Sequence, residues 1–377
     1  MGQPRLTMAE SSLLNNAARI LKLVQAGTPA DQALRESLTQ HRHFTAPAER
    51  RGISRAVFTY YRWWRWIEDG SSPQKQLAAA LELQRRFDTN PASFKPEALA
   101  AKVAPGWLRD EMDVMPAAWL AQLQREPALW IRAKTGTGAA LAKKLGQCAP
   151  APQSPDALHY TGSTDLYRTP EFQAGEFEIQ DLASQLVGLA AAPKTGETWW
   201  DACAGEGGKT MHLSDLMRNK GLLWASDRSL RRLGKLKERA ARAQVFNFRA
   251  APWEGGPKLP TKTKFDGILV DAPCTGIGTW QRNPHARWTT APKDVHELAT
   301  VQSQLLHHVA GSLKPGGRLV YAVCTLTRAE TTAVAATFTA AHPELTPVSG
   351  QTLWPHELNA NGMFIAQWRR KCLWLSS

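Results

Sequence analysis

The chain has 377 residues, of which 43% are hydrophobic, and its 46 Lys and Arg against 33 Asp and Glu give a formal net charge of +13. This length predicts two or three domains, and the longest apolar stretches, such as 187–193, are far too short to span a bilayer. The five cysteines, at positions 148, 203, 274, 324 and 372, include no Cys-x-x-Cys pair, which argues against a disulfide framework or a zinc ribbon.

Residues 1–126 are expected to form an all-helical domain. Apolar side chains recur at helical spacing between Leu13 and Val24, and Thr28-Pro29 is typical of the start of a second helix. Three more helices are expected, near 46–67, 73–87 and 116–125. The third helix carries a stripe of Tyr and Trp side chains, which either contacts RNA or, more often for such stripes, forms the core.

Residues 127–194 are expected to form a small α+β segment. Their sequence predicts a strand over 128–133 and a helix over 138–145. The stretch 148–160 is rich in Pro and is interpreted as a connector. A helix over 177–189 is expected to end the segment.

From residue 195 to residue 377 short apolar runs alternate with helical patterns. Strands are expected at 197–203, 221–227, 244–250, 265–271 and 317–324, and helices near 209–218, 229–243, 294–313 and 328–341. This alternation predicts an α/β domain with a parallel, doubly wound, Rossmann-like sheet. Ligands of such sheets bind at the carboxyl ends of the strands.

Two features at the first strand ends point to a nucleoside ligand. The first strand leads into a Gly-rich turn, 201–210, and the second ends at Asp227. Such a turn admits a nucleotide-like ligand, and an acid at that distance is placed to bind a ribose diol, although it can also cap the next helix. Cys203 stands where a phosphate-binding loop has its first Gly, so the turn is not expected to bind phosphates. A nucleoside ligand without phosphates is favoured, and the ligand expected is S-adenosylmethionine.

Two cysteines follow neighbouring strands of the predicted sheet. Cys274 comes shortly after Asp271 at the end of the fourth strand, and Cys324 ends the fifth. A single buried cysteine is usually an inert packing residue. Because the carboxyl ends of adjacent strands face the same crevice, the pair beside Asp271 favours a catalytic role.

These motifs resemble those of the Nop/Sun-type RNA cytosine-C5 methyltransferases. The matching segments lie at 178–186, 201–210, 265–276, 321–326 and 354–364, and the resemblance covers about residues 127–372. The N-terminus is similar to the NusB-like RNA-binding domain of the bacterial small-subunit rRNA members. The resemblance implies that Cys324 is the nucleophile, that Cys274 assists product release, and that Asp271 contacts the cofactor or the base. It assigns the cofactor site to Asp227, Asp271, Cys203, Ala204, Gly205, Glu206, Gly207, Gly208 and Lys209.

The sequence departs from the family pattern at four places. Gly205 and Glu206 replace an Ala-Pro pair, Gly267 replaces an Arg, and Thr325 replaces the Ser after the nucleophile. An acid usual after the third strand, near the adenine, is missing, and its absence predicts weaker cofactor binding. Both cysteines are retained, so an active enzyme is expected.

The predicted function is an S-adenosylmethionine-dependent RNA methyltransferase that forms 5-methylcytosine through a covalent Cys-C6 adduct. The expected substrate is rRNA, with tRNA as the alternative. Two other functions stay open: a DNA cytosine-C5 methyltransferase that uses Cys274 as nucleophile, and a non-catalytic rRNA-binding assembly factor. Residues 1–14 show no secretory signal, so a cytoplasmic monomer without a membrane partner or a metal site is expected.

The charge of the chain indicates a polyanionic partner, and nucleic acid is the most frequent one. The densest basic run falls on one predicted helix, where it is either part of an RNA-binding surface or an ordinary solvated face. Its members are Arg228, Arg231, Arg232, Lys235, Lys237, Arg239 and Arg242.

Overall fold

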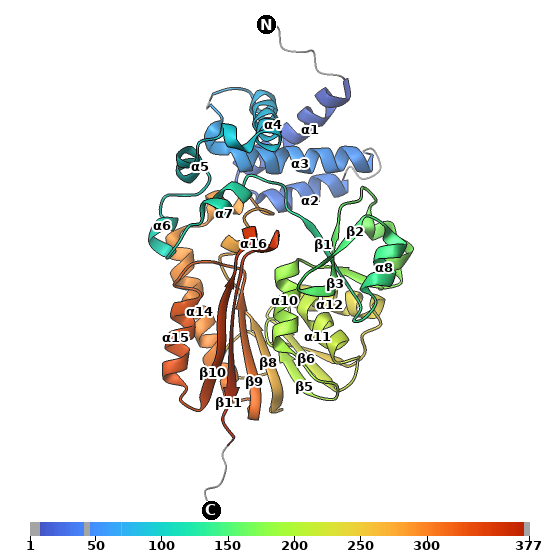
Figure 1. The fold of residues 1–377 in the computed structure, drawn as a ribbon, viewed down its shortest axis with the longest axis vertical. Coiled ribbons are helices and arrows are strands. Elements are labelled where there is room, and N and C mark those ends of the chain that lie inside the picture. Colours follow the sequence, from blue (N-terminus) through green and yellow to red (C-terminus); the bar gives the residue numbers. More distant parts are fainter. Residues whose placement is uncertain (1–7, 41–45, 69, 373–377) are drawn as a thin grey trace, which may run out of the picture. The chain divides into compact units, whose positions relative to one another are not determined.

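The computed structural model describes residues 8–40, 46–68 and 70–372 (Figure 1). The chain divides into two compact units. The helical unit comprises residues 1–126 and 279–290, and the sheet unit comprises 127–278 and 291–377. Of the segment 1–14, which carried the prediction on secretion, residues 1–7 lie outside the described residues. Over the described ranges, no helix combines the length and the hydropathy that crossing a membrane requires.

All regular elements in the described part of the helical unit are helices. They are α1 (Met8–Gln25), α2 (Ala30–Gln40), α3 (Pro47–Trp63), η1 (Trp64–Trp66), α4 (Pro73–Thr89), η2 (Pro91–Ser93), α5 (Pro96–Lys102), α6 (Leu108–Glu111), α7 (Ala117–Gln122) and α13 (Ala286–Thr289). The five predicted helices are confirmed as α1, α2, α3, α4 and α7. Ser72 begins α4 as its N-cap and accepts the N–H of Lys75. The likeness of this unit to NusB stays a prediction.

The aromatic stripe of α3 forms the core of the helical unit. Trp63 is fully buried and packs on Phe87 and Phe94, with ring centroids 5.6 and 5.0 Å apart. Tyr60 and Tyr61 are also buried, whereas Trp64 is 39% exposed. The stripe therefore packs inside the unit, as such stripes usually do.

The segment 279–290, expected in the domain 195–377, has its contacts in the helical unit. The buried guanidinium of Arg287 donates to the carbonyl oxygens of Val103 and Leu123, each at 2.9 Å. Trp288 donates its indole N–H to the carbonyl oxygen of Tyr61 at 2.7 Å. Because a buried guanidinium needs such acceptors, the helical unit includes these residues from far along the chain.

The sheet unit begins with a small antiparallel sheet of order β2-β3-β1-β4. Its elements are β1 (Leu129–Ala133), α8 (Gly138–Leu145), β2 (Cys148–Ala151), β3 (Ser154–Tyr160), η3 (Leu166–Arg168), α9 (Pro170–Gln173) and β4 (Phe177–Ile179). The connector predicted at 148–160 is wrong, because β2 and β3 form a hairpin there. Pro150 is tolerated since β2 lies at the edge of the sheet, where a missing N–H breaks no ladder.

The helix predicted over 177–189 is also wrong at its start. Residues 177–179 form β4, which pairs with β1, and the helix α10 spans Leu182–Ala191. Asp181 determines this boundary, because its carboxylate accepts the N–H of Ala183 as the N-cap of α10.

The main sheet has seven strands in the order β10-β11-β9-β8-β5-β6-β7. The strands are β5 (Thr198–Asp201), β6 (Leu222–Asp227), β7 (Phe248–Pro252), β8 (Phe265–Asp271), β9 (Leu313–Val323), β10 (Leu345–Leu353) and β11 (Met363–Arg370). Strands β5 to β9 pair in parallel, which confirms the predicted doubly wound, Rossmann-like sheet. The antiparallel pair β10 and β11 was not predicted.

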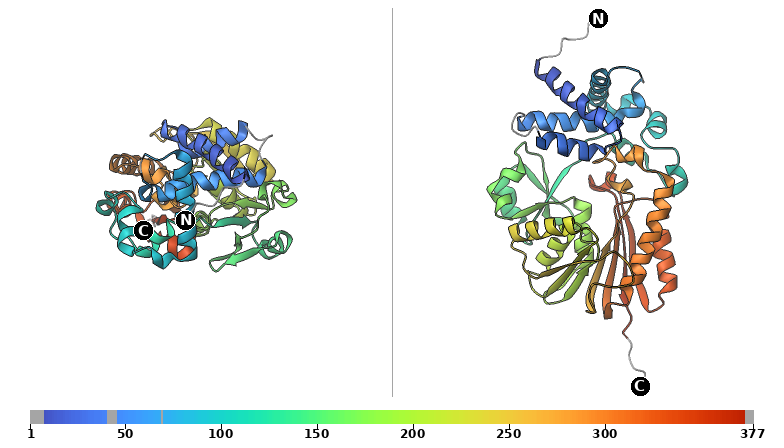
Figure 2. Two further views of the ribbon diagram at one scale, coloured as in Figure 1. Left: turned by 90° about the horizontal axis from the view of Figure 1, so that it is seen from above. Right: turned by 180° about the vertical axis from the view of Figure 1, so that it is seen from behind.

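Helices cover both faces of this sheet (Figures 1 and 2). They are α11 (Gly208–Leu216), α12 (Leu230–Arg242), η4 (Ile277–Thr279), α14 (Pro292–Ala310), α15 (Thr332–Ala341) and α16 (Pro355–Leu358), besides α10. Alternate residues of each strand point to opposite faces. Trp200 packs with the face that α14 and α15 cover, and its neighbour Trp199 packs with the face of α10 and α11. The parallel core therefore fixes the strand ends that carry the candidate site.

Candidate active site

Three predicted site residues and the buried Asp201 lie at the carboxyl ends of four neighbouring parallel strands. Asp201 ends β5, Asp227 ends β6, Asp271 ends β8, and Cys324 follows β9 directly. The register places Asp201 beside Leu269 of β8, and Asp271 beside Ala322 of β9. Since parallel strands end at one edge of the sheet, these side chains share that edge.

The Gly-rich turn runs from Ala202 to Gly207 and leads into α11. Gly205 and Gly207 have φ of +56° and +86°, a region that favours glycine. A Cβ at Gly207 would lie 2.6 Å from the Leu236 side chain, so α12 requires glycine there. A Cβ at Gly205 would meet only the end of Arg232, at 4.0 Å. The turn therefore leaves room for a ligand at Gly205.

Asp227 binds the Gly-rich turn to the start of α12. Its Oδ2 accepts the N–H of Gly205 at 3.0 Å, and its Oδ1 accepts the N–H of Ser229 at 2.8 Å. The N-cap of α12 is Ser229, whose hydroxyl accepts the N–H of Arg232. The capping role considered for Asp227 thus belongs to Ser229, and Asp227 is free to serve the turn.

Lys209 and Asp271 form an ion pair across the site. The Nζ of Lys209 lies 2.6 Å from Oδ2 of Asp271. Burial alone would lower the pKa of Lys209, but the Asp271 carboxylate outweighs it and the pKa is raised above its ordinary value. The electrostatic interaction with Cys324 contributes to this increase.

The two cysteines predicted to act together are neighbours. The sulfur of Cys274 lies 3.3 Å from the sulfur of Cys324, and both side chains are half-buried. The hydrogen bond with Cys324, together with burial, raises the pKa of Cys274 well above its ordinary value. Cys274 is therefore held as a thiol. Burial likewise raises the pKa of Cys203, which makes that thiol a poor nucleophile.

The turn residue Glu206 and most of the basic run on α12 are held in ion pairs. Arg231 faces Glu206, Arg232 faces Asp227, Lys235 faces Glu238, and Arg239 and Arg242 face Glu178. Five of the seven basic side chains thus have carboxylate partners within the sheet unit. This run accordingly resembles an ordinary ion-paired face more than a row of phosphate-binding groups.

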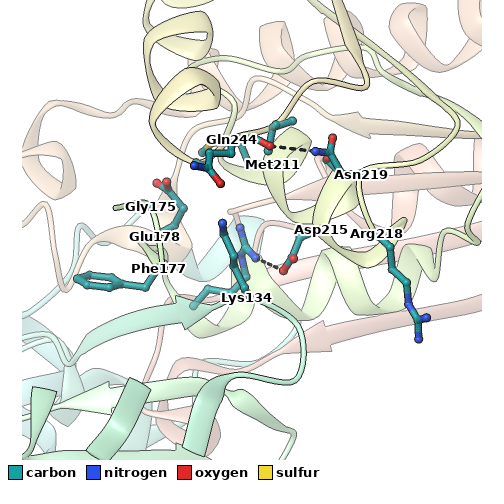
Figure 3. A pocket seen from close by; sticks show the side chains of 13 residues that line it. Lys134, Gly175, Phe177, Glu178, Met211, Asp215, Arg218, Asn219 and Gln244 are labelled. Carbon is teal, nitrogen blue, oxygen red and sulfur yellow. Dashed lines mark hydrogen bonds and ion pairs between the residues drawn. The ribbon is translucent and has the colours of Figure 1, made fainter. Parts of the chain in front are cut away.

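A cavity of about 150 Å³ lies away from these strand ends (Figure 3). It is lined by residues of the small sheet, by the last residues of α11 and by the residues that follow α12, including Lys134, Glu178 and Gln244. The ion pair between Arg132 and Asp215, 2.8 Å long, holds the small sheet to α11 there. The cavity contains none of the predicted catalytic residues.

Two buried carboxyl groups of the site were missed by the sequence analysis. Glu330, after β9, binds both cysteine segments, as described below. Asp201 is fully buried and accepts the Thr210 hydroxyl at 2.7 Å. Burial raises the pKa of Asp201 from 3.8 to about 7, although the Thr210 hydroxyl opposes the shift. No local sequence pattern marks either carboxyl group as part of the site, because each is distinguished by its burial in the folded chain.

The Asp201 carboxyl is expected to make stability depend on pH. Because its pKa is higher in the folded than in the unfolded chain, the folded state binds the proton more tightly, and stability falls as the pH rises toward 7. Between pH 5 and pH 8, the free energy of unfolding should fall by about 2–3 kcal/mol more in the wild type than in Asp201→Asn. Denaturant unfolding at both pH values measures this.

Asp266→Asn is the matched control for that experiment. Asp266 lies in the same sheet, but Lys314 and the Thr198 N–H outweigh its partial burial and lower its pKa. It therefore titrates below pH 5, and its variant should follow the wild-type pH dependence from pH 5 to pH 8. If the free energy of unfolding changed equally with pH in the wild type and in Asp201→Asn, the role given to Asp201 would be refuted.

Within the described ranges, no group of three or more His, Cys, Asp or Glu side chains is arranged to hold a metal ion. The site thus offers two thiols, an ion pair and an open glycine turn. Such a set suits nucleophilic chemistry on a substrate bound beside a nucleoside cofactor.

Comparisons with known proteins agree with this chemistry. Residues 188–369 match the family described as 16S rRNA methyltransferase RsmB/F. A relative from Bacillus subtilis, named "Probable ribosomal RNA small subunit methyltransferase B", is 36% identical over 219 residues, which are 53% of this chain and 49% of that protein. The chain thus spans about half the length of the curated relatives it matches.

Solved structures are similar over more of the chain. PH0851 covers 98% of this chain and 100% of its own, with a TM-score of 0.80 and 22% identity, which shows a common fold. A methyltransferase homolog protein from Pyrococcus horikoshii covers 67% of this chain and 90% of its own, with a TM-score of 0.59 and 26% identity. The family resemblance expected from the cysteine motifs is confirmed. Over residues 188–369, this sequence is thus similar to the methyltransferases of the RsmB/F family.

Proposed function

We propose that this protein transfers a methyl group from S-adenosylmethionine to C5 of a cytosine in RNA, through a covalent adduct between Cys324 and C6. The observation that carries the proposal is the pair of thiols, Cys274 and Cys324, with sulfurs 3.3 Å apart at adjacent strand ends. C5 and C6 are bonded neighbours in the base. Two groups that act on them in turn must therefore lie this close together.

The residues at the turn fit the proposed cofactor, which supplies an electrophilic methyl group. Asp227 offers carboxylate acceptors for ribose hydroxyls at the end of β6, and the turn leaves open space at Gly205 and Gly208. Lys209 begins α11 next to this turn and is bound to Asp271. Asp271 would contact either the cofactor or the base.

Cytosine C5 is too poor a nucleophile to be methylated directly. Addition of a thiolate to C6 makes C5 nucleophilic. Lys209 carries an ammonium group beside Asp271 at the same strand ends and interacts electrostatically with Cys324, and a neighbouring cation favours the thiolate form of a cysteine. Cys324 would therefore attack C6. In the later elimination, the Cys274 thiol would pass its proton to the departing sulfur of Cys324 and accept the C5 proton, so that the C5–C6 double bond forms again as the Cys324–C6 bond breaks.

The substrate we propose is small-subunit rRNA, as the names of the relatives suggest. The base must leave its stack to reach the strand ends, which favours a single-stranded or loop region. We further propose that the protein works as a monomer in the cytoplasm. Two thiols this close stay reduced in that compartment.

An assay with purified protein tests this function. The protein is incubated with S-adenosylmethionine and, in separate reactions, small-subunit rRNA, tRNA or duplex DNA, and the nucleosides are analysed by mass spectrometry. The proposal predicts 5-methylcytidine in rRNA. Formation of 5-methyldeoxycytidine would instead indicate a DNA enzyme, and RNA binding without any cofactor binding would indicate an assembly factor.

Asp227→Ala is expected to weaken binding of S-adenosylmethionine. Loss of a charged hydrogen-bond partner costs about 1.5–3 kcal/mol, so the Kd should rise about 10- to 150-fold in calorimetry. Ser229→Ala is the control, because it removes the cap of α12 and leaves the Asp227 carboxylate in place. An unchanged Kd for Asp227→Ala would limit that residue to fixing the turn.

A further inference from the structure

The buried carboxylate of Glu330 is hydrogen-bonded to both segments that carry the cysteines. Glu330 lies in the segment that connects β9 to α15, and its side chain is fully buried. Oε1 accepts the backbone N–H of Thr275 at 2.9 Å and the amide N–H of Gln302 at 3.0 Å. Oε2 accepts the hydroxyls of Thr325 at 3.1 Å, Thr327 at 3.0 Å and Thr275 at 2.5 Å. The carboxylate thus has five donors.

Two of these donors follow the cysteines directly in the chain. Thr275 is the residue after Cys274, and Thr325 is the residue after Cys324. Their hydroxyl oxygens lie 2.9 Å from each other and both contact Oε2 of Glu330. One carboxylate is therefore hydrogen-bonded to both segments that carry the thiols.

Glu330 is itself held by hydrogen bonds from side chains of α14 and β9. The amide of Gln302 also donates to the carbonyl oxygen of Pro273 at 2.9 Å. The hydroxyl of Tyr321 donates to the carbonyl oxygen of Glu330 at 2.6 Å and lies 2.9 Å from Oε1 of Gln302. All three side chains are buried, and a fully satisfied buried network of this kind is rigid.

We propose that Glu330 is a positioning residue that holds the Cys274 and Cys324 segments at their reacting separation, acting through Thr275 and Thr325. The inference rests on the proposed function, because both thiols must reach neighbouring atoms of one base. The hydrogen bonds of Glu330 reach the residue that follows each cysteine. Its effect passes through the hydroxyls and the Thr275 N–H that its carboxylate binds.

Three threonine variants separate this role from a general contribution to stability. Thr275→Val, Thr325→Val and Thr327→Val each remove one hydroxyl from Oε2 and keep the size of the side chain. Only Thr275 and Thr325 adjoin a cysteine, so Thr327→Val is the matched control. We expect Thr275→Val and Thr325→Val to lower kcat at least tenfold with KM within about twofold of wild type, and Thr327→Val to keep kcat within about twofold.

Substitutions of Glu330 itself complete the kinetic test. Glu330→Gln keeps the shape but replaces one acceptor oxygen by an N–H₂ donor, and it should lower kcat more than either single Thr variant. Glu330→Asp keeps the charge and should recover part of the loss. Equal losses of kcat in Thr327→Val and Thr325→Val, or wild-type kcat in Glu330→Gln, would overturn the proposal.

A measurement independent of methyl transfer keeps this proposal separate from the proposed function. Phenylarsine oxide binds two thiols that lie close together, and Cys274→Ala identifies its binding to this pair. Glu330→Gln and the double variant Thr275→Val/Thr325→Val should bind it at least tenfold more weakly than wild type, whereas Thr327→Val should bind it as wild type does. Unchanged binding in all variants would refute the positioning role, even in a protein that methylates RNA. The expected pattern in a protein that methylates nothing would refute only the proposed function.

Discussion

Replacement of Cys324 by serine is expected to abolish methyl transfer. A hydroxyl is a far weaker nucleophile than a thiolate at neutral pH, so C6 would not be attacked and C5 would not become reactive. We expect the rate of 5-methylcytidine formation to fall at least about 10³-fold, as for other nucleophile variants. The rate is measured in single-turnover reactions with saturating RNA, which separates chemistry from binding.

Cys148→Ser is the control for the serine substitution. Cys148 is a half-buried thiol in β2 of the small sheet, outside the seven-stranded sheet whose strand ends carry the catalytic pair. Its variant should keep the wild-type rate. Substantial activity in Cys324→Ser would mean that another group attacks C6, and the rival assignment then falls on Cys274.

Replacement of Cys274 by alanine is expected to trap an intermediate rather than to prevent attack. Cys274 is held as a thiol by its hydrogen bond with Cys324 and by burial, so it is suited to proton transfer and not to attack. Without it, Cys324 would still add to C6, but elimination would stall. The expected product is a covalent protein–RNA complex that survives denaturing electrophoresis.

The opposite outcome distinguishes the two types of cytosine methyltransferase. If Cys274 were the nucleophile, Cys274→Ala would be inactive without an adduct and Cys324→Ser would be tolerated. An adduct that forms only in Cys324→Ser would reverse our assignment. If neither variant changed the activity, both cysteines would be packing residues.

The parallel part of the fold was predictable because strands and helices alternate regularly after residue 195. The strands contain short apolar runs, and the ends of β5, β6, β8 and β9 carry an acid or a cysteine. The hairpin β2–β3 was not predictable in the same way, because Pro150 is a turn signal that an edge strand tolerates. The antiparallel strands β10 and β11 were not predicted because only the short helix α16 separates them, and long helical patterns were the guide to the other strands.

The sequence analysis placed the segment around Arg287 in the domain 195–377 because its contacts are with residues far away in the sequence. Its partners Val103, Leu123 and Gln124 lie more than 160 positions earlier, and no local pattern reports such contacts. This affects the design of truncations. Deletion of residues 1–126 would leave the Arg287 guanidinium without these acceptors, in a segment that begins five residues after Cys274.

The strand-end residues of the site were predictable as a group, since parallel strands end at one edge of the sheet. The positions of Cys274, Cys324 and Asp271 at or after the ends of predicted strands were enough to group them in one site. Glu330 could not be found in this way. Its importance depends on burial and on five donors from three separate parts of the chain, which only the folded arrangement brings together.

The covalent role of Cys324 is tested most directly by the double variant Cys274→Ala/Cys324→Ser. Labelled substrate RNA is incubated with S-adenosylmethionine and either Cys274→Ala or the double variant, and the products are separated by denaturing electrophoresis. The account predicts a slowly migrating protein–RNA band with Cys274→Ala and its complete absence with the double variant. A band of equal intensity in both would show that Cys324 is not the residue that bonds to the base.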